Sequence, residues 1–506
     1  MRTNRSLRRL TVLLAMLLGL SLSLAACGRS GGAGAQSVVL NVGATTEPTG
    51  MDPAVDTGAG TPFVLLYNVY ETLVRIDEKG EIKPLLARSW SVSSDGSVYT
   101  FKLEPNATFA SGKPVNAEAV IASFERTRSG ENTTEVLKRQ MSRIKEMRAI
   151  DDHTVEVALN GPSQRWLYDI TSTAGIIYDL SSGQNLSEQP AGSGPYTFSR
   201  HDVGSMVSLV RNKNYWGTGP RVDEVNFRYY ADANAMVAAM LSGQLDIVSN
   251  LTVPQSVGQF SDTSRFKVLE GTTNGEVVLG FNHGNQALSN LKVRQAINHA
   301  IDRRAVLDSA WGGKGTLIGS MVPPTDPWYE DLSNTYPYDP AKAKQLLEEA
   351  GYANGLTLRM RVPTLPYAPP IAKLVAAQLR EVGIEVNVEE LDFSTWLSQV
   401  YTQRDYDMTV VAHVEPWDLP QFANPNYYWQ YNNPQFAELI NKADGAATSE
   451  EQEAILKQAA KMLADDAAAD WLFLLPNLVV TTTEISGITT NTTGLSFDMT
   501  HVATSR

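Results

Sequence analysis

Hydrophobic residues in the second half of the chain recur at the spacing of a helix face. Val293, Ala296, Ile297, Ala300 and Ile301 fall at positions i, i+3, i+4, i+7 and i+8. Residues at that spacing lie on one side of an α-helix, because the helix has 3.6 residues per turn. The pattern predicts an amphipathic helix whose apolar side packs on a core.

Helical and strand patterns then alternate between residues 339 and 388. Asp339-Pro340 offers an N-cap followed by proline at the first helical position, which is typical of a helix start. A strand is expected over Leu356 to Val362, a helix over Ile371 to Val382 and a strand over Ile384 to Val388. Strands that alternate with helices favour the α/β fold class with a largely parallel sheet.

The first half of the chain is richer in short alternating strands. Strands are expected at Val38 to Val42 and Val98 to Leu103, and a strand pair at Ile144 to Ile150 and Val155 to Leu159. The apolar run Phe63 to Val74 is expected to be helical. Further expected elements are a helix over Asn116 to Arg126, strands at Met206 to Val210 and Val479 to Thr482, and a helix from Ser449 to about Asp466.

The N-terminus carries an export signal. Four arginines precede an apolar stretch, Leu10 to Ala25, which is shorter than the about 20 residues that a membrane-spanning helix needs. The stretch ends in Leu24-Ala25-Ala26-Cys27-Gly28, which resembles the lipobox of bacterial lipoproteins. The interpretation is a signal peptide over residues 1–26, lipid attachment at Cys27 and a glycine-rich flexible tether over residues 27–36.

Composition and charge narrow the functional classes. The chain has 506 residues and a formal charge of −13, which becomes −17 when the four arginines of the signal are removed. An acidic protein of this kind is a poor candidate for nucleic-acid binding, which needs a basic face. The single cysteine excludes an intramolecular disulfide and a cysteine-cluster metal site.

The usual catalytic motifs do not support an enzyme. The match to G-x-S-x-G at residues 28–32 lies in the tether, without the strand and helix that a nucleophile elbow requires. No H-E-x-x-H, P-loop or G-x-G-x-x-G sequence occurs, and the six histidines are scattered without metal-ligand spacing. We expect no catalytic residue, no metal site and no cofactor.

Several characteristic segments follow one another along nearly the whole mature chain. They include Tyr70-Glu71-Thr72-Leu73-Val74, Gly192-Ser193-Gly194-Pro195-Tyr196, Tyr215-Trp216-Gly217 and the run Val293 to Asp302. In this order the segments resemble the peptide- and nickel-type (family 5) extracellular solute-binding lipoproteins of bacterial ABC importers. The resemblance implies an α/β, two-lobed periplasmic-binding-protein-like fold of the large cluster C type. Lobe one would comprise residues 37–284 and 478–506 with an inserted subdomain at about 70–190, and lobe two residues 285–477.

The resemblance implies that the protein binds a solute and catalyses no reaction. Two lobes would close by a hinge on an oligopeptide and deliver it to the permease and ATPase subunits of the importer. Alternatives are a non-peptide solute (nickel or another metal chelate, a haem-like ligand, an oligosaccharide), an extracellular peptidase, or a signalling or adhesion lipoprotein. We expect a monomer outside the cytoplasm, tethered to the membrane by the lipid at Cys27, and no nucleic-acid partner.

The resemblance also points to ligand-binding residues. Family members that bind peptides hold the α-ammonium with an aspartate that follows a tryptophan after a strand matching Tyr406 to Val411. Here the segment reads Ala412-His413-Val414-Glu415-Pro416-Trp417-Asp418. His413 stands where the tryptophan would be, and Glu415 or Asp418 near the acid. A carboxylate in a closed cleft binds an ammonium through charge-assisted hydrogen bonds, whereas the alternative is a solvated acidic loop with Trp417 in the core.

Two more segments bear on the ligand. Dipeptide binders carry an arginine for the ligand carboxylate just before a Tyr-x-Pro sequence like Tyr367-Ala368-Pro369, but Leu365 stands there. A buried free carboxylate without a cation is costly, so the departure favours longer peptides or another solute. In lobe one, Thr57 and Gly58 belong to a loop that matches a pocket-lining segment, and its glycines allow close backbone approach.

Overall fold

The computed structural model describes residues 37–56 and 58–506. The chain divides after Val38, and the unit Val39–Arg506 holds all helices and strands of the described residues. The expected signal peptide (1–26) and tether (27–36), with Cys27, lie outside the described residues, and so does Thr57. The bounds of the two lobes stay a prediction; for description, lobe one denotes residues 37–284 and 478–506, and lobe two denotes residues 285–477.

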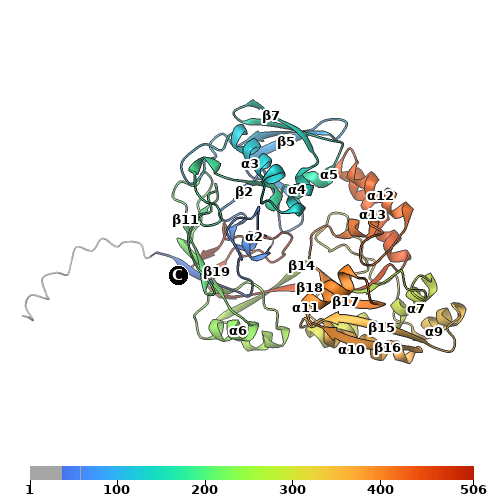
Figure 1. Cartoon of the computed structure of the whole chain (residues 1–506). Helices are drawn as coiled ribbons and strands as arrows, with labels where there is room; N and C mark the ends of the chain where they lie inside the picture. The colour runs from blue at the N-terminus through green and yellow to red at the C-terminus, as the bar shows by residue number, and fades with distance from the viewer. Residues whose placement is uncertain (1–36, 57) are drawn as a thin grey trace, which may run out of the picture. The chain divides into compact units, whose positions relative to one another are not determined.

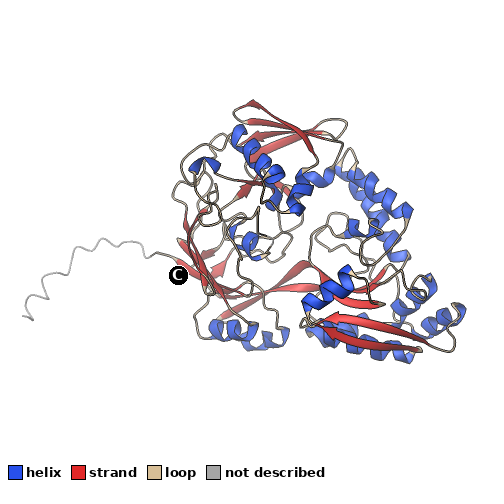
Figure 2. Cartoon of the chain, in the orientation of Figure 1, coloured by secondary structure: helices blue, strands red, loops and turns tan. Residues whose placement is uncertain are grey.

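A ten-stranded sheet runs through the body of the protein (Figure 2). Its strands, in spatial order, are β10 (Tyr196–Asp202), β11 (Met206–Arg211), β12 (Glu224–Tyr229), β1 (Val39–Ala44), β13 (Ile247–Val248), β18 (Ala469–Thr482), β14 (Phe266–Phe281), β17 (Met408–His413), β15 (Leu356–Pro363) and β16 (Ile384–Leu391). The first five strands lie within the predicted bounds of lobe one and the last three within those of lobe two. Between them lie β18, which crosses the predicted boundary, and β14, which ends just before it.

The sheet is mixed, not largely parallel as predicted. β1 pairs in parallel with β12 and β13, and β15 with β16 and β17. The strands in the middle pair antiparallel, β14 with both β17 and β18, and β13 with β18. The helix–strand alternation that suggested a parallel sheet holds for β15 and β16, which α10 connects, but β14 and β18 run against their neighbours.

A second, four-stranded sheet forms the subdomain in lobe one. It contains β5 (Ala87–Val92), β6 (Val98–Leu103), β8 (Thr154–Leu159) and β7 (Ile144–Asp151), all antiparallel. The smaller strand pairs are β2 (Glu71–Thr72) with β9 (Ile176–Ile177), β3 (Val74–Ile76) with β4 (Ile82–Pro84), and β19 (Ile485–Ser486) with β20 (Ala503–Thr504).

The helices begin where the sequence supplies caps. Asn116, Asp339 and Thr448 each accept a backbone hydrogen bond from three residues later, and α3, α9 and α13 follow them. The α-helices are α2 (Gly60–Leu65), α3 (Ala117–Ser129), α4 (Glu135–Met141), α5 (Gln164–Asp169), α6 (Ala233–Leu241), α7 (Leu291–Ala300), α8 (Arg303–Trp311), α9 (Pro340–Glu349), α10 (Ala368–Glu381), α11 (Phe393–Trp396), α12 (Pro434–Asp444) and α13 (Ser449–Asp465). Short turns are η1 (Thr173–Gly175), η2 (Leu180–Ser182), η3 (Pro254–Phe260), the π-helical η4 (Leu397–Thr402) and η5 (Leu419–Ala423).

The expected helix over Phe63 to Val74 is wrong beyond its first turn. Helix α2 ends at Leu65, Tyr67 takes a positive φ of 62°, and the chain continues into β2 and β3. A non-glycine residue with positive φ cannot continue a right-handed helix. The run is apolar because it is buried, and its hydrophobicity alone did not distinguish helix from strand.

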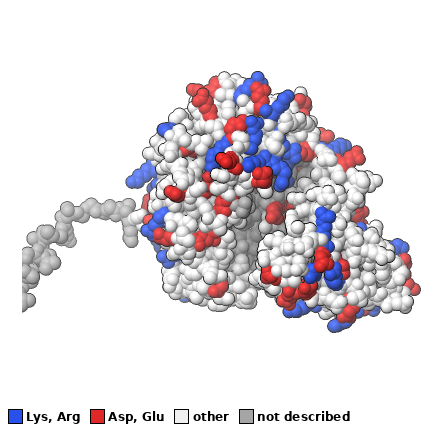
Figure 3. Space-filling model, in the orientation of Figure 1, with Lys and Arg blue, Asp and Glu red and all other residues white. Residues whose placement is uncertain are grey.

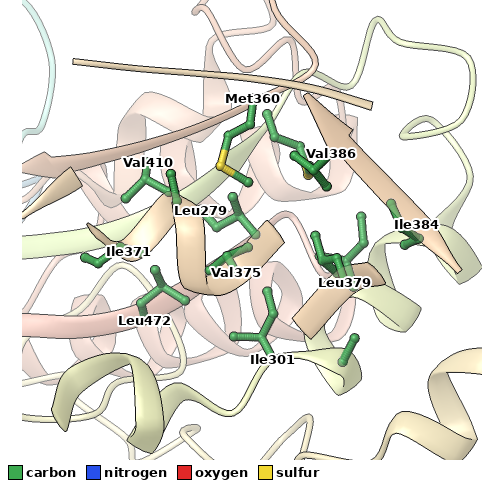
Figure 4. Packing of buried hydrophobic residues seen from close by; sticks show 14 of the residues in the cluster. Leu279, Ile301, Met360, Ile371, Val375, Leu379, Ile384, Val386, Val410 and Leu472 are labelled. Atoms are coloured by element: carbon green, nitrogen blue, oxygen red, sulfur yellow. The ribbon is translucent and has the colours of Figure 1, made fainter. Parts of the chain in front are cut away.

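The core of lobe two lies between the sheet and helices α7, α8, α9 and α10. Figure 1 shows α10 beside β15 and β16, and Figure 4 shows apolar side chains from these strands and helices meeting there. The labelled residues are Leu279, Ile301, Met360, Ile371, Val375, Leu379, Ile384, Val386, Val410 and Leu472. Each such buried side chain contributes about 1.5–3 kcal/mol relative to exposure, so this core fixes the end of the sheet that carries β17.

Within the described part of the chain, we find no helix that combines the length and the apolar character needed to cross a membrane.

Candidate functional site

Strands β14 and β18 carry the chain between the lobes and place one acidic residue at the crossing. Their ladder is irregular between Thr272 and Glu276, where β14 leaves the part of the sheet in lobe one. Beyond this point Glu276 lies opposite His413 on β17 and Leu474 on β18. A strand position at the end of lobe one is thus joined directly to the last residue of β17.

His413 is buried at the end of β17, and both of its ring nitrogens have partners. Nδ1 lies 2.6 Å from Asp418 Oδ2, and Nε2 lies 2.8 Å from the Tyr428 hydroxyl. Asp418 is also buried, with 4 % of its surface exposed. The predicted site residues His413 and Asp418 are therefore neighbours, and they form a buried pair that orients the imidazole.

Glu415 lies in the same loop but is exposed, and its Oε2 accepts a 3.2 Å hydrogen bond from the Val414 amide. Ligand atoms of His413, Glu415 and Asp418 all lie within 4.8 Å of one another. A metal ion would need a free nitrogen of His413, and both are engaged. We therefore do not assign these residues as metal ligands.

Trp417 packs between the lobes. Its ring stacks on Tyr168 of α5 at 4.6 Å and 28°, and it meets Trp328 edge to face at 4.3 Å. The Arg165 side chain, also on α5, donates to the Trp417 carbonyl at 3.0 Å. Trp417 has a positive φ of 60°, a conformation that costs a bulky residue of the order of 1–3 kcal/mol and that clusters at ligand sites.

Two further carboxylates belong to this region. Glu276 is 2 % exposed, and burial raises its pKa well above the usual range, with the charges of Asp418, Asp326 and Glu415 adding to the effect. Burial also raises the pKa of Asp326 to about 8, against the opposing charge of Arg165. Sequence reasoning missed the buried Glu276 and the half-buried Asp326, because a single carboxylate leaves no periodic signal in the sequence. For Glu276 the one hint is an acidic residue directly before the apolar run Val277 to Leu279.

A hollow separates the two lobes in the space-filling view, and acidic side chains are visible inside it (Figure 3). We use the name acidic cluster for Glu276, Asp326, Glu415 and Asp418. Its members come from β14, from the loop between α8 and α9, and from the loop after β17. The chain brings together acids separated by up to about 140 residues.

The predicted pocket-lining loop of lobe one is organised around Asp56. Its carboxylate accepts hydrogen bonds from the Gly50 and Gly58 amides at 2.8 and 2.9 Å and from the Thr49 and Thr61 hydroxyls. Burial alone would raise the pKa of Asp56, but these hydrogen bonds outweigh it and lower the pKa. Gly58 therefore acts here as a backbone donor that holds the loop.

The Tyr-x-Pro segment acts as a support for β17. The Tyr367 hydroxyl accepts a 2.8 Å hydrogen bond from the Ala412 amide, and Leu365 packs against the core of lobe two. Tyr428 and Trp429 are 2 % and 1 % exposed. These aromatic side chains pack beneath His413, and Tyr428 holds its Nε2.

The lobes are also joined by what we call the interlobe clasp: Asp444 at the end of α12, with Arg143, Ser163 and Arg165 of lobe one. Asp444 accepts from Arg143 Nη1 at 2.7 Å, from the Ser163 hydroxyl at 2.7 Å and from the Arg165 amide at 3.2 Å. Ser163 is itself the N-cap of α5. Figure 1 shows the end of α12 next to α5. A carboxylate at a helix N-terminus is favourable because the first amide groups there lack partners.

The fold and this interlobe site define a solute-binding protein. The structure resembles a periplasmic binding protein associated with an ABC transporter, DppA from Helicobacter pylori in complex with the peptide STSA, with a TM-score of 0.74 and 25% sequence identity over 92% of this chain and 98% of that one. Residues 81–475 match the model of the bacterial extracellular solute-binding proteins, family 5. The chain belongs to that family.

Curated relatives agree on the class and differ in the ligand. A putative ABC transporter peptide-binding protein of Brucella ovis is 33% identical over 70% of this chain and 68% of its own. Heme-binding protein A of Haemophilus influenzae is 28% identical over 81% of this chain and 82% of its own. The family therefore does not by itself specify the solute.

Proposed function

We propose that this protein is the substrate-binding component of an ABC importer for oligopeptides, which it captures between its lobes by hinge closure and passes to the permease. It acts by binding alone, without a catalytic step. The observation that carries the proposal is the acidic cluster at the interlobe junction, because a peptide brings an ammonium group to a site that has carboxylates to receive it. Similarity to a peptide-binding protein of Brucella ovis supports the same ligand class.

The topology supports hinge closure. Only β14 and β18 need to bend for the lobes to separate within the ten-stranded sheet, and their ladder is already irregular beside Glu276. A ligand that contacts both lobes binds the closed arrangement better and so increases its population. The packing of Trp417 against Tyr168 gives the closed arrangement a further contact.

We further propose that Cys27 is acylated and holds the mature protein at the outer face of the membrane, with residues 27–36 as the tether. Lipid chains add about 0.8 kcal/mol of membrane affinity per buried CH₂ group. The absence of an arginine at Leu365 supports longer peptides over dipeptides, since no cation stands at that position for a dipeptide carboxylate.

The experiment is native mass spectrometry of the purified protein, followed by calorimetry with peptides of the mass that is found. Glu415→Ala should weaken binding without unfolding the protein, because the side chain is exposed and bonded only to the Val414 amide. Asp418→Asn, which keeps the shape beside His413, should do the same. A haem, a metal chelate or a sugar as the bound mass, or wild-type affinity in both variants, would overturn the assignment.

A further inference from the structure

We propose that Glu276 is a ligand-binding residue that receives a positively charged group of the solute, so that the protein selects cationic solutes. This inference rests on the proposed binding function and specifies its substrate class. The chemical group concerned is a basic nitrogen, either the α-ammonium of a peptide or a lysine or arginine side chain.

The strand register places Glu276 on the site. Glu276 and His413 are partners in the antiparallel pairing of β14 with β17. Side chains of directly opposed residues lie on the same face of a sheet. The Glu276 side chain therefore extends on the face where His413 meets Asp418, which is the face that the loop after β17 covers.

One oxygen of the buried Glu276 carboxyl group lacks a partner, although a backbone hydrogen bond from Glu276 itself reaches the group. Its Oε2 is buried and has no hydrogen-bond partner among the described residues. Burying an unpaired carboxyl group is costly in either protonation state. A donor on the ligand would supply the partner that Glu276 Oε2 lacks.

Glu71 provides a contrast within the same chain. It is as deeply buried as Glu276, but its oxygens accept hydrogen bonds from Ser193, Trp216 and Tyr215 at 2.7, 2.9 and 2.9 Å. The chain thus satisfies a buried carboxylate completely where its role is to hold lobe one together. The carboxyl oxygen without a hydrogen-bond partner is a feature of Glu276, at the interlobe site.

The surrounding carboxyl groups determine which ligand charge the site favours. The charged groups that act most strongly on Glu276 are all carboxylates: Asp418, Asp326 and Glu415. Arg165 is near Asp326, but it already pairs with Asp169 at 2.9 Å and with the Trp417 carbonyl. Burial favours the protonated forms of Glu276 and Asp326, and a bound cation favours their ionised forms. A cation is therefore favoured at this site, whereas an anion would meet acidic groups alone.

The test compares Glu276→Gln with wild-type protein and with Glu390→Gln. Glu390 is on β16, is exposed and pairs with Lys373 of the same lobe at 2.8 Å, outside the acidic cluster. Three probes separate the sources of charge: Ala-Ala-Ala, N-acetyl-Ala-Ala-Ala, and N-acetyl-Ala-Arg-Ala. Affinities are measured by calorimetry at neutral pH, and the stability of each ligand-free variant by thermal unfolding.

We expect wild-type protein and Glu390→Gln to prefer at least one cationic probe over the acetylated neutral peptide by about tenfold or more. In Glu276→Gln that preference should fall about tenfold, whereas binding of the neutral probe changes little. The cationic probe whose affinity falls in Glu276→Gln shows whether the residue binds the α-ammonium or the side-chain cation. Equal loss for all three probes, or no change for any, would overturn the proposal.

Ligand-free Glu276→Gln should be at least as stable as wild type, because the substitution removes an uncompensated acid. A marked loss of stability would show that Glu276 has a structural partner and would refute the inference. If wild-type protein binds no peptide, the oligopeptide assignment fails by itself. The Glu276 proposal is then decided by the co-purified solute, which must contain a basic nitrogen and must be retained about tenfold less by Glu276→Gln; a neutral or anionic solute contradicts it.

Discussion

Removing the carboxylate of Asp444 should open the interlobe clasp without unfolding either lobe. In Asp444→Ala, the Arg143 guanidinium, the Ser163 hydroxyl and the Arg165 amide lose their acceptor. When the lobes are apart, all of these groups are solvated, so the substitution affects closure and leaves the free energy of unfolding of each lobe nearly unchanged. The prediction thus separates closure from folding.

The size of the effect follows from the exposure of the partners. Arg143 and Asp444 are 42 % and 25 % exposed at their side chains, so their ion pair contributes no more than about 1 kcal/mol. The hydrogen bonds from Ser163 and Arg165 contribute about 1 kcal/mol each. Loss of the clasp should therefore cost about 2–3 kcal/mol, which lowers the ratio of closed to open molecules about 30- to 160-fold.

Small-angle scattering of the ligand-free protein measures this ratio, and calorimetry with the solute found by mass spectrometry measures its consequence. We expect a larger radius of gyration and an affinity reduced by up to the same factor, since the bound form is closed. Asp465→Ala is the matched control, because Asp465 forms an exposed ion pair with Lys461 inside lobe two. If scattering and affinity in Asp444→Ala equal those of wild type, the clasp does not hold the lobes together.

Two further predictions concern lobe one and the anchor. Burial raises the pKa of Glu71 to about 7, although hydrogen bonds from Trp216, Ser193 and Tyr215 oppose the shift. Since the folded pKa exceeds the ordinary 4.5, wild-type stability should fall by about 3 kcal/mol as the pH rises from about 4.5 to 7, and urea unfolding of Glu71→Gln should show a flatter pH dependence over that interval. Cys27→Ser should leave the protein unprocessed or released into the medium in a cell fractionation, and membrane retention of a processed Cys27→Ser form would rule out the lipid anchor.

Short sequence patterns were sufficient to predict the helices and strands whose formation depends on residues close together in the chain. Asp339-Pro340 and Thr448 start helices where predicted, because a cap acts within one turn. The alternating pattern of Val98 to Leu103 gives β6, and the pair around Asp151 gives β7 and β8. In each case the favourable contacts lie close in sequence, so a short window contains the information.

The long strands that join the lobes escaped this reasoning. β14 runs from Phe266 to Phe281 and contains charged, polar and glycine residues, because its first half is partly exposed and its second half is buried. No single period describes a strand whose surroundings change midway. For β18 only the end, Val479 to Thr482, was predicted, and the mixed pairing of the sheet could not be deduced without both strands.

For the candidate site, the family resemblance predicted the loop after β17 and none of the residues outside it that make up the acidic cluster. The position of the loop after β17 placed His413, Glu415, Trp417 and Asp418, and the structure brings the first, second and fourth of these close together. Spacing along the chain did not reveal that His413 and Asp418 engage each other. That pairing changes the expectation for ligand binding, because a carboxylate already bound to an imidazole is a weaker acceptor for an incoming ammonium.

Because Asp418 already engages His413, the proposed recognition of a cation depends mainly on Glu276. Glu415 is exposed, and Asp418 has its partner in His413. Among the four acids of the acidic cluster, Glu276 alone combines deep burial with an oxygen that has no partner among the described residues, on the face of the sheet that carries His413. Because Glu276 lies on a strand that connects the lobes, a cation bound there would hold β14 beside the end of β17, so that ligand recognition and closure would depend on the same residue.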